Sequence, residues 1–506
     1  MGKGKSGGWV LFLFVLVIVF FMGLLANSIM ERRSEAVIMR KAKVDLGEWE
    51  SRNEVWGEAY PEEYETFVKT EGDELEDILE ENPNVAILFA GYGFAKDYNK
   101  PRGHFHAVED VRKTLRTGGP TEEKGSPMPN TCWTCKSPDV PRMMDELAEG
   151  GKDGAAEFYK GGGKWETLGS QIINPIGCGD CHDPETMGLT ITRPALKEGY
   201  KALTGNDISS ATHQEMRSLV CAQCHVEYYF DKHLDGEKKG TPYLTFPWSE
   251  GITVEGMQKH LDKRGPDGKG HKDWIHAVSK TRMYKAQHPG WEFWQLGPHG
   301  QQNVSCADCH MPYESRGGMK YSSHHVTSPL EYIDKTCQVC HRQPAEELER
   351  AVKDRQHAIV KLRTKAENVL VKAHFETKAA MEEGATDTEL ENIRTLIREA
   401  QWRWDFAVAS HGASFHAPLQ VSNILGDSID KAAQARLELS KVLAKHGFIG
   451  DVTLPDISTK AKAQKVIGLN MDKLNKEKAD FLKNMVPKWD EEAEKRHKSW
   501  DEKKGI

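Results

Sequence analysis

Hydrophobic and polar residues follow three different patterns along the chain. Residues 9–25 form an almost unbroken apolar run. Between about residues 31 and 343 the apolar residues keep no long period, and glycine and proline recur at short intervals. Further along, apolar residues return every three or four positions, as in an amphipathic helix. The pattern predicts a terminal segment over 1–30, short helices and loops over 31–343, and long helices over 344–506, the last two packed as one unit with very little β-structure.

The final region predicts several long helices. Its helical spacing begins with Leu348, Val352, Ile359 and Leu362. Gly384 marks a helix end, and Thr386 with Glu389 forms a capping box for the next helix, which runs to about residue 411. A third helix is expected from about residue 421 to 447. Such helices either form a dimer face or pack only on their own chain, and both interpretations remain open.

All ten cysteines fall in five Cys-x-x-Cys pairs. They are Cys132 and Cys135 before Lys136, Cys178 and Cys181 before His182, Cys221 and Cys224 before His225, Cys306 and Cys309 before His310, and Cys337 and Cys340 before His341. Cys-x-x-Cys-His attaches c-type haem through two thioethers, with the histidine as the proximal iron ligand. Structural zinc would pair two such units about 12 to 20 residues apart, and a thioredoxin-like site would use one pair. The wide, irregular separations therefore favour five covalent haems and no disulfide.

Lys136 stands where the other four motifs have histidine. A free lysine has a pKa of about 10.4 and must lose its proton before it binds iron. One interpretation is a degraded motif whose iron ligand comes from elsewhere. The other is that this haem performs chemistry while four bis-histidine haems, whose iron is saturated, carry electrons.

Composition and haem attachment restrict the partners and the cellular location of the protein. The formal charge of −8 argues against nucleic acid as a partner. Hydrophobic residues make up 38% of the chain, below the usual share, which fits a core made partly of cofactor. Covalent haem attachment takes place on the outer side of the cytoplasmic membrane. The motifs therefore predict export and a periplasmic location.

Residues 9–25 provide the export segment. The run follows Lys3 and Lys5 and is short for a spanning helix, which needs about 17 to 25 residues. Ala26-Asn27-Ser28 offers a small-x-small cleavage site, so an uncleaved membrane anchor and a cleaved signal both remain open. The basic residues after the run favour the opposite orientation by the positive-inside rule. That orientation would leave the haem motifs in the cytoplasm, so the motifs outweigh the charge pattern.

The order of motifs, Lys first and His in the next four, resembles the pentahaem cytochrome c nitrite reductases that form ammonia. Local stretches are similar too: Arg102-Gly103-His104, Leu115-Arg116-Thr117-Gly118, Val226-Glu227-Tyr228-Tyr229-Phe230, Lys285-Ala286-Gln287-His288-Pro289, Gln401-Trp402-Arg403-Trp404-Asp405 and His416-Ala417-Pro418. The resemblance covers residues from about 50 to 490. It implies a mainly α multihaem cytochrome c fold, in which short helices and loops surround five haems.

The resemblance also implies the distal iron ligands. Spacing alone cannot select them, because the chain has 21 histidines. The matched stretches pair His104 with His225, His299 with His341, His324 with His182 and His416 with His310. His106, His325 and His411 lie close to these in sequence and remain the rival candidates.

Further site residues follow from the same resemblance. The open face of the Lys136 haem would hold nitrite beside Arg116, Tyr228 and His288. Arginine and histidine side chains attract an anion and donate hydrogen bonds to its oxygens. A calcium ion is implied next to them. Its ligands would be the Glu227 carboxylate, the Gln287 amide oxygen and the backbone carbonyls of Tyr228 and Lys285, all hard oxygen donors.

The implied activity is the six-electron reduction of nitrite to ammonium in the periplasm. Hydroxylamine, nitric oxide and sulfite are expected side substrates. Electrons would come from a membrane quinol-oxidising multihaem cytochrome or another donor, and the enzyme would be a homodimer. Two alternatives stay open: a multihaem enzyme acting on another small anion or nitrogen species, and an electron-transfer cytochrome without catalysis.

Overall fold

The computed structural model describes residues 6–41, 46–47, 49–72, 74–121, 123–162, 164–265 and 268–504. Helices dominate these residues, and the named strands form three two-stranded antiparallel hairpins. The hairpins pair β1 (Tyr229–Asp231) with β2 (Tyr243–Thr245), β3 (Trp274–Ile275) with β4 (Arg282–Met283), and β5 (Tyr313–Arg316) with β6 (Met319–Ser322). The prediction of a mainly α fold with very little β-structure is confirmed.

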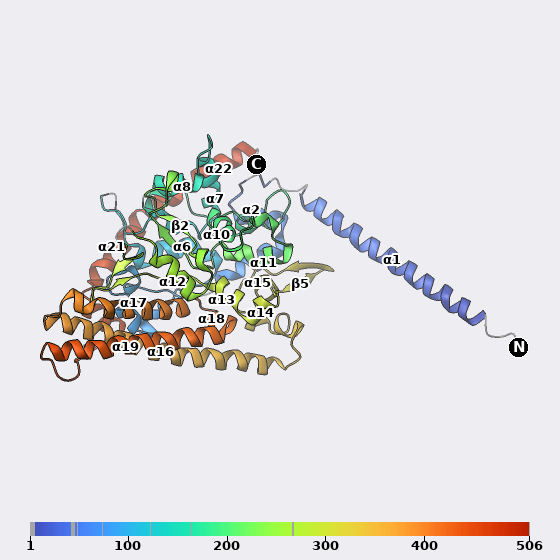
Figure 1. Cartoon of the computed structure of the whole chain (residues 1–506). Coiled ribbons are helices and arrows are strands. Elements are labelled where there is room, and N and C mark those ends of the chain that lie inside the picture. The colour runs from blue at the N-terminus through green and yellow to red at the C-terminus, as the bar shows by residue number, and fades with distance from the viewer. Residues whose placement is uncertain are drawn as a thin grey trace.

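Helix α1 (Ser6–Lys41) projects away from the rest of the chain (Figure 1). Within it, the 24-residue stretch Gly8–Glu31 is long and apolar enough to cross a membrane. The helix continues past Leu25, where the apolar run ends, and reaches Lys41. Its described apolar side chains are exposed, as expected of an anchor or a signal sequence.

Short helices and loops build the middle of the chain. The helices are α2 (Asn53–Ala59), α3 (Pro61–Val68), α4 (Ile78–Glu81), α5 (Asn84–Leu88), α6 (Ala107–Lys113), α7 (Asp139–Leu147), α8 (Gly154–Gly162), α9 (Cys178–Cys181), α10 (Pro194–Thr204), α11 (His213–Ala222), α12 (Val254–Asp262), α13 (Gly290–Leu296), α14 (Pro298–Gln301) and α15 (Cys306–His310). Four 3-10 turns among the described residues carry site residues: η3 (His104–His106), η4 (Leu115–Thr117), η5 (Asn130–Trp133) and η11 (Cys337–Val339). Most of these elements are too short to be stable alone, so packing and cofactor must hold them.

Three long helices lie side by side along one edge of the molecule (Figure 1). They are α16 (Ala345–Glu382), α17 (Asp387–Ala409) and α19 (Pro418–Lys445), with the short α18 (Ala413–His416) between the last two. The predicted capping box is present, because Thr386 Oγ1 accepts the Glu389 N–H and the Glu389 carboxylate accepts the Thr386 N–H. Leu390, Ile397 and Leu439 are among the buried residues of their shared core.

The end of the chain returns to the short-helix region. Residues beyond 455 form α20 (Lys460–Val466), α21 (Met471–Asn484) and α22 (Val486–Lys504). Phe481 and Trp489 place their rings 5.5 and 5.8 Å from the buried Trp165 ring, edge-on in both cases. Gly119 has to be a glycine because a Cβ atom there would collide with the Glu477 carbonyl of α21. Helix α21 therefore covers the turn η4, which carries Arg116.

Candidate functional site

One cavity of about 2430 Å³ runs through the short-helix region. All ten cysteines and Lys136 line it, and all ten cysteines are unpaired. Pockets for a single small ligand measure about 300 to 1,000 Å³. The cavity is therefore large enough for several macrocycles, and its walls carry the thiols that would attach them.

Each attachment motif forms a tight turn. Such a turn places residues three and four apart on one side, so both thiols can face the same ligand. In the second, third and fifth motifs the histidine N–H donates to the carbonyl oxygen of the first cysteine, at 2.9, 3.0 and 2.9 Å. Helix α15 spans the fourth motif. The first motif differs, because the Lys136 N–H donates to the carbonyl of Trp133 at 2.9 Å, the tighter 3-10 pattern.

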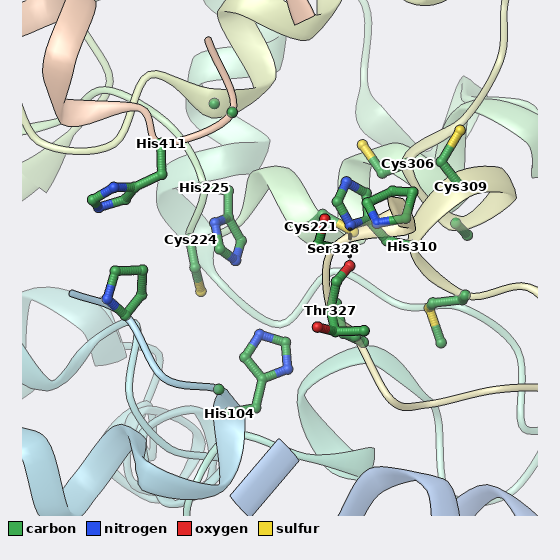
Figure 2. A pocket seen from close by; sticks show the side chains of 18 of the residues that line it. His104, Cys221, Cys224, His225, Cys306, Cys309, His310, Thr327, Ser328 and His411 are labelled. Atoms are coloured by element: carbon green, nitrogen blue, oxygen red, sulfur yellow. Dashed lines mark hydrogen bonds between the residues drawn. The ribbon is translucent and has the colours of Figure 1, made fainter. Parts of the chain in front are cut away.

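Four pairs of histidine rings face each other across the cavity. The ring centroids are 6.2 Å apart for His104 and His225, His182 and His324, and His299 and His341, and 6.3 Å apart for His310 and His416. Figure 2 shows the first pair, with Cys221 and Cys224 nearby. A metal–imidazole bond is about 2 Å long, so these separations leave room for one iron between each pair of rings.

Hydrogen bonds fix several of these rings in the orientation that metal binding needs. The Nδ1 atoms of His182, His310 and His324 each lie 2.9 Å from a backbone carbonyl oxygen, that of Met187, Thr327 or Ser322. Figure 2 shows the bond between His310 and Thr327. Since Nδ1 then carries the proton, Nε2 is left with a free lone pair for iron.

Burial keeps the same rings neutral. It lowers the pKa of His225 to about 3 and that of His324 and His416 to about 4. A neutral imidazole is the form that binds a metal ion. The four pairs therefore fit haem iron in geometry, and His225, His324 and His416 also fit it in protonation.

The rival histidines are placed differently. Both ring nitrogens of His106 are engaged, one with the Glu109 carboxylate and one with the Glu71 carbonyl, each at 2.8 Å. His325 Nδ1 lies 3.0 Å from the Tyr332 hydroxyl. In Figure 2 His411 lies on the cavity wall to one side of His225, and no described histidine ring faces it. The geometry favours the first set of four pairs over these rivals.

Lys136 lines the cavity without a partner for its amine. Among the described residues the amine makes no hydrogen bond and no ion pair. Each of the four motif histidines, in contrast, faces the ring of a second histidine. The first motif therefore offers an amine that no described residue engages, and this amine would be available to the iron of a haem attached at Cys132 and Cys135.

Arg116 lines the same cavity and is held in place by three residues. Its backbone N–H donates to Asp97 Oδ1 at 3.1 Å, and its Nη1 donates to Asn99 Oδ1 at 3.3 Å. The guanidinium carbon lies 4.9 Å from the centre of the Phe94 ring, within cation–π range. No carboxylate pairs with this guanidinium in the part of the chain that the structure describes, so its charge is available to an anion.

Tyr228 and His288 lie on the same cavity, with ring centroids 6.5 Å apart. Burial raises the pKa of Tyr228 well above its usual value. Burial, and then the positive charge of Lys136, lower the pKa of His288 well below 6.5. The structure thus brings Arg116, Lys136, Tyr228 and His288 to one cavity, with a phenol and an imidazole as hydrogen-bond donors near a cation.

The expected calcium ligands are also brought together. Glu227 is 1% exposed, and its Oε2 accepts the Gln287 N–H at 2.6 Å. Burial raises the pKa of Glu227, and no ion pair reaches this carboxylate among the described residues. The Lys285 amine is 2.6 Å from Asp405 Oδ1, which occupies its side chain and leaves its carbonyl for a cation. A dication would supply the positive charge that the buried carboxylate needs as a partner, so these oxygen donors fit calcium.

Some site residues carry no signal in the sequence. Asn99, Asp97 and Phe94 position Arg116, and Arg193 contacts the turn of Lys136, yet none belongs to a motif. Asp405 lies within one of the stretches that match the nitrite reductases, which would have been a reason to single it out. The residues outside these stretches acquire a role only through the contacts that the fold creates.

Comparisons with known proteins agree with this arrangement. The sequence model of the family described as cytochrome c552 matches residues 52–500. A cytochrome c-552 of Bacteroides fragilis is 53% identical over 496 residues, 96% of either chain, and one of Porphyromonas gingivalis is 51% identical over 497 residues, also 96% of either chain. A solved cytochrome c nitrite reductase of Desulfovibrio desulfuricans, whose catalytic subunit has two calcium sites, is similar with a TM-score of 0.72 and 28% identity. It covers 85% of this chain and 91% of its own.

Proposed function

Since the chain belongs to the cytochrome c552 family, we propose that it reduces nitrite to ammonium at the cavity beside Lys136. The family and the oxidoreductase class predicted from the sequence are confirmed, as is the multihaem cytochrome c fold. The observation that carries the proposal is an asymmetry among five otherwise equal motifs. Four have a histidine facing a histidine, and the fifth has an amine that no described residue engages, on the cavity that Arg116, Tyr228 and His288 also line.

Five haem c groups would be held by the ten cysteines. The proposed axial pairs are His225 with His104, His182 with His324, His310 with His416, and His341 with His299. Lys136 would be the single protein ligand of the remaining iron. When bound, the haems supply electrons one at a time and an iron on which nitrite nitrogen can bind. A saturated bis-histidine iron suits transfer, and an iron with an open face suits reaction.

The residues around the open face would bind and orient the anion. Arg116 attracts nitrite and donates hydrogen bonds to its oxygens. It keeps its proton throughout, because a guanidinium does not lose its proton in proteins. His288 would hold or donate a proton at a nitrite oxygen, and Tyr228 would donate a hydrogen bond beside it. Reduction to ammonium consumes six electrons and eight protons, so proton donors near the substrate are needed repeatedly.

Calcium would bind at Glu227, Gln287 and the carbonyls of Tyr228 and Lys285. The support is the buried carboxylate of Glu227, which has no described cationic partner, and its bond to the Gln287 N–H. A dication at this position would fix the backbone on both sides of Tyr228 and His288. It would also raise the positive potential that an anionic substrate meets.

Location, partners and side activities belong to the same proposal. The apolar stretch Gly8–Glu31 supports export to the periplasmic side, with α1 either retained as an anchor or removed as a signal. The electron donor would be a membrane quinol-oxidising multihaem cytochrome or another donor. The long helices α16, α17 and α19 would form the interface of a homodimer. Hydroxylamine, nitric oxide and sulfite would be reduced as side substrates.

Anaerobic turnover tests the activity. The purified holoprotein is given nitrite and a reduced viologen, and ammonium is measured as the product. We expect one ammonium per nitrite consumed. Oxidation of viologen with no ammonium would contradict the proposal, and no oxidation at all would favour an electron-transfer cytochrome. A high-spin iron signal in the oxidised protein also separates the two: we expect it for a nitrite reductase with an open iron site and not for an electron-transfer cytochrome.

A further inference from the structure

A buried arginine outside every motif joins three of the haem-attachment turns. Arg193 immediately precedes α10 and is 1% exposed. Its Nε donates to the Thr134 carbonyl at 2.9 Å, and its Nη2 donates to the Ser137 carbonyl at 2.8 Å. These two carbonyls lie on either side of Lys136 in the chain. One guanidinium thus holds the backbone both before and after the lysine.

The same arginine is paired with the second motif. Its Nη1 lies 2.5 Å from Asp180 Oδ1, and both side chains are buried. Asp180 is one of the two spacer residues between Cys178 and Cys181. Because burying an unpaired charge is strongly unfavourable, this ion pair fixes Arg193 in place. The position of the Lys136 turn is therefore tied to that of the second haem motif.

The third motif is tied to the same point. Gln223, a spacer residue between Cys221 and Cys224, accepts the backbone N–H of Arg193 at 3.0 Å with Oε1 and donates to the Asp180 carbonyl at 3.1 Å. Cys135 Sγ lies 3.9 Å from the Gln223 carbonyl oxygen. Arg193 and the spacer residues Asp180 and Gln223 thus form one polar cluster, which contacts the first haem motif as well.

Lysine needs such support more than histidine does. A ligating imidazole can be oriented through its second nitrogen, as His182 and His310 are by backbone carbonyls. A lysine amine has no second anchoring atom, and its flexible four-carbon stem leaves the amine free to move away from the metal. No described residue bonds to the Lys136 amine, so the backbone of the turn is what positions it. The Lys136 N–H closes a 3-10 turn rather than the α-type turn of the second, third and fifth motifs.

We propose that Arg193 is a positioning residue for Lys136, which holds the turn so that the amine stays on the haem iron. The inference rests on the proposed function only in taking Lys136 as the iron ligand. Arg193 itself would touch neither substrate nor iron. It acts through the carbonyls of Thr134 and Ser137, each of which would be left buried without the arginine's hydrogen bond if the guanidinium were removed.

The test compares two arginine-to-lysine variants of the holoprotein. Arg193→Lys keeps the charge opposite Asp180 but replaces a planar fork of donors by one ammonium, which cannot reproduce the contacts to both carbonyls. Arg217→Lys is the matched control. Arg217 pairs with Asp308, a spacer residue of the fourth motif, at 2.6 Å, and it makes no described contact with the Lys136 turn. Haem number is measured by mass, and the high-spin iron signal by electron paramagnetic resonance of the oxidised protein.

We expect both variants to carry five haems, and only Arg193→Lys to lose or shift the wild-type high-spin signal and to turn over nitrite more slowly. A wild-type signal in fully loaded Arg193→Lys would overturn the inference while leaving the proposed function intact. Absence of a high-spin signal from the wild type would overturn the ligand assignment and the inference together.

The double variant Arg193→Met with Asp180→Asn removes both charges of the buried ion pair. Loss of the high-spin signal with all five haems attached would support the positioning role of Arg193, and a retained signal would overturn it.

Discussion

The rings of Tyr228 and His288 lie with their centroids 6.5 Å apart on the cavity that also contains Lys136 and Arg116. Their backbones both adjoin the expected calcium ligands, Tyr228 next to Glu227 and His288 next to Gln287. The Gln287 N–H bond to Glu227 holds these two segments together. Two donors that come from distant parts of the chain are thereby fixed relative to each other and to the space beside them.

His288→Asn tests the proton-donor role. The variant keeps a polar side chain of similar reach but cannot transfer a proton, and a missing proton donor typically lowers the rate by about 10² to 10⁴. We expect ammonium formation to fall by at least about 10²-fold while haem and calcium contents stay normal. His357→Asn, on the exposed side of α16, is the control. Normal turnover at full calcium occupancy would exclude the role and leave His288 as a packing residue.

Arg116→Lys tests anion binding. The variant retains the positive charge but loses the planar donor group that is placed by Asn99 and Phe94. A hydrogen bond to a charged group contributes about 1.5 to 3 kcal/mol, so KM for nitrite should rise by about ten-fold to a hundred-fold. The effect on kcat should be smaller, since protons come from elsewhere. Steady-state kinetics separate the two constants, and an unchanged KM would remove Arg116 from substrate binding.

Much of this arrangement could be predicted because its signals are local. A motif such as Cys-x-x-Cys-His requires only one turn of chain, and the capping box of Thr386 and Glu389 requires only one helix end. The histidine pairs could be named only through resemblance, because ligands such as His104 and His225 are far apart in sequence. Nothing local marks the Arg193 contacts to Thr134 and Ser137, which exist only once three motifs are packed together.

The last helices show the same limit. The sequence predicts long helices over 344–506, but it does not predict that α21 covers the turn of Arg116. That contact depends on Lys478, whose buried amine donates to the Arg112 carbonyl at 3.0 Å and to Thr117 Oγ1 at 3.1 Å. A lysine in a highly charged segment looks like a surface residue until the fold buries it.

Lys478 gives a pH-dependent prediction. Burial lowers its pKa from 10.5 to about 7, so between these values the unfolded chain binds more protons than the folded one. Its contribution to stability is therefore complete above pH 10.5 and lost as the pH falls toward 7. For one proton the slope is at most about 1.4 kcal/mol per pH unit.

Lys478→Met should remove this slope. The quantity to compare is the difference in denaturation midpoint between variant and wild type across pH 7 to 10. We expect the wild type to gain stability relative to the variant as the pH rises. Lys473→Met, at an exposed position of the same helix, should show no such trend. A difference that stays constant with pH would mean that the folded protein holds Lys478 protonated throughout.

Helix α1 leads to a prediction about the attachment of the protein to the membrane. An uncleaved α1 would keep the protein with the membrane fraction after a high-salt wash, because the apolar stretch Gly8–Glu31 binds through burial and not through charge. We expect N-terminal sequencing of the washed fraction to include Lys3 and Lys5. A mature chain that begins near Ile29 would instead identify the segment as a cleaved signal.

Ammonium formation from isotopically labelled nitrite, by the wild type and by Lys136→His at equal haem content, tests directly whether nitrite is reduced at the Lys136 haem. We expect labelled ammonium in proportion to nitrite from the wild type. The variant should keep its five haems and lose most of this rate, since an imidazole cannot reproduce the amine at that position. Wild-type rates in the fully loaded variant, or no labelled ammonium from the wild type, would contradict nitrite reduction at a lysine-ligated haem.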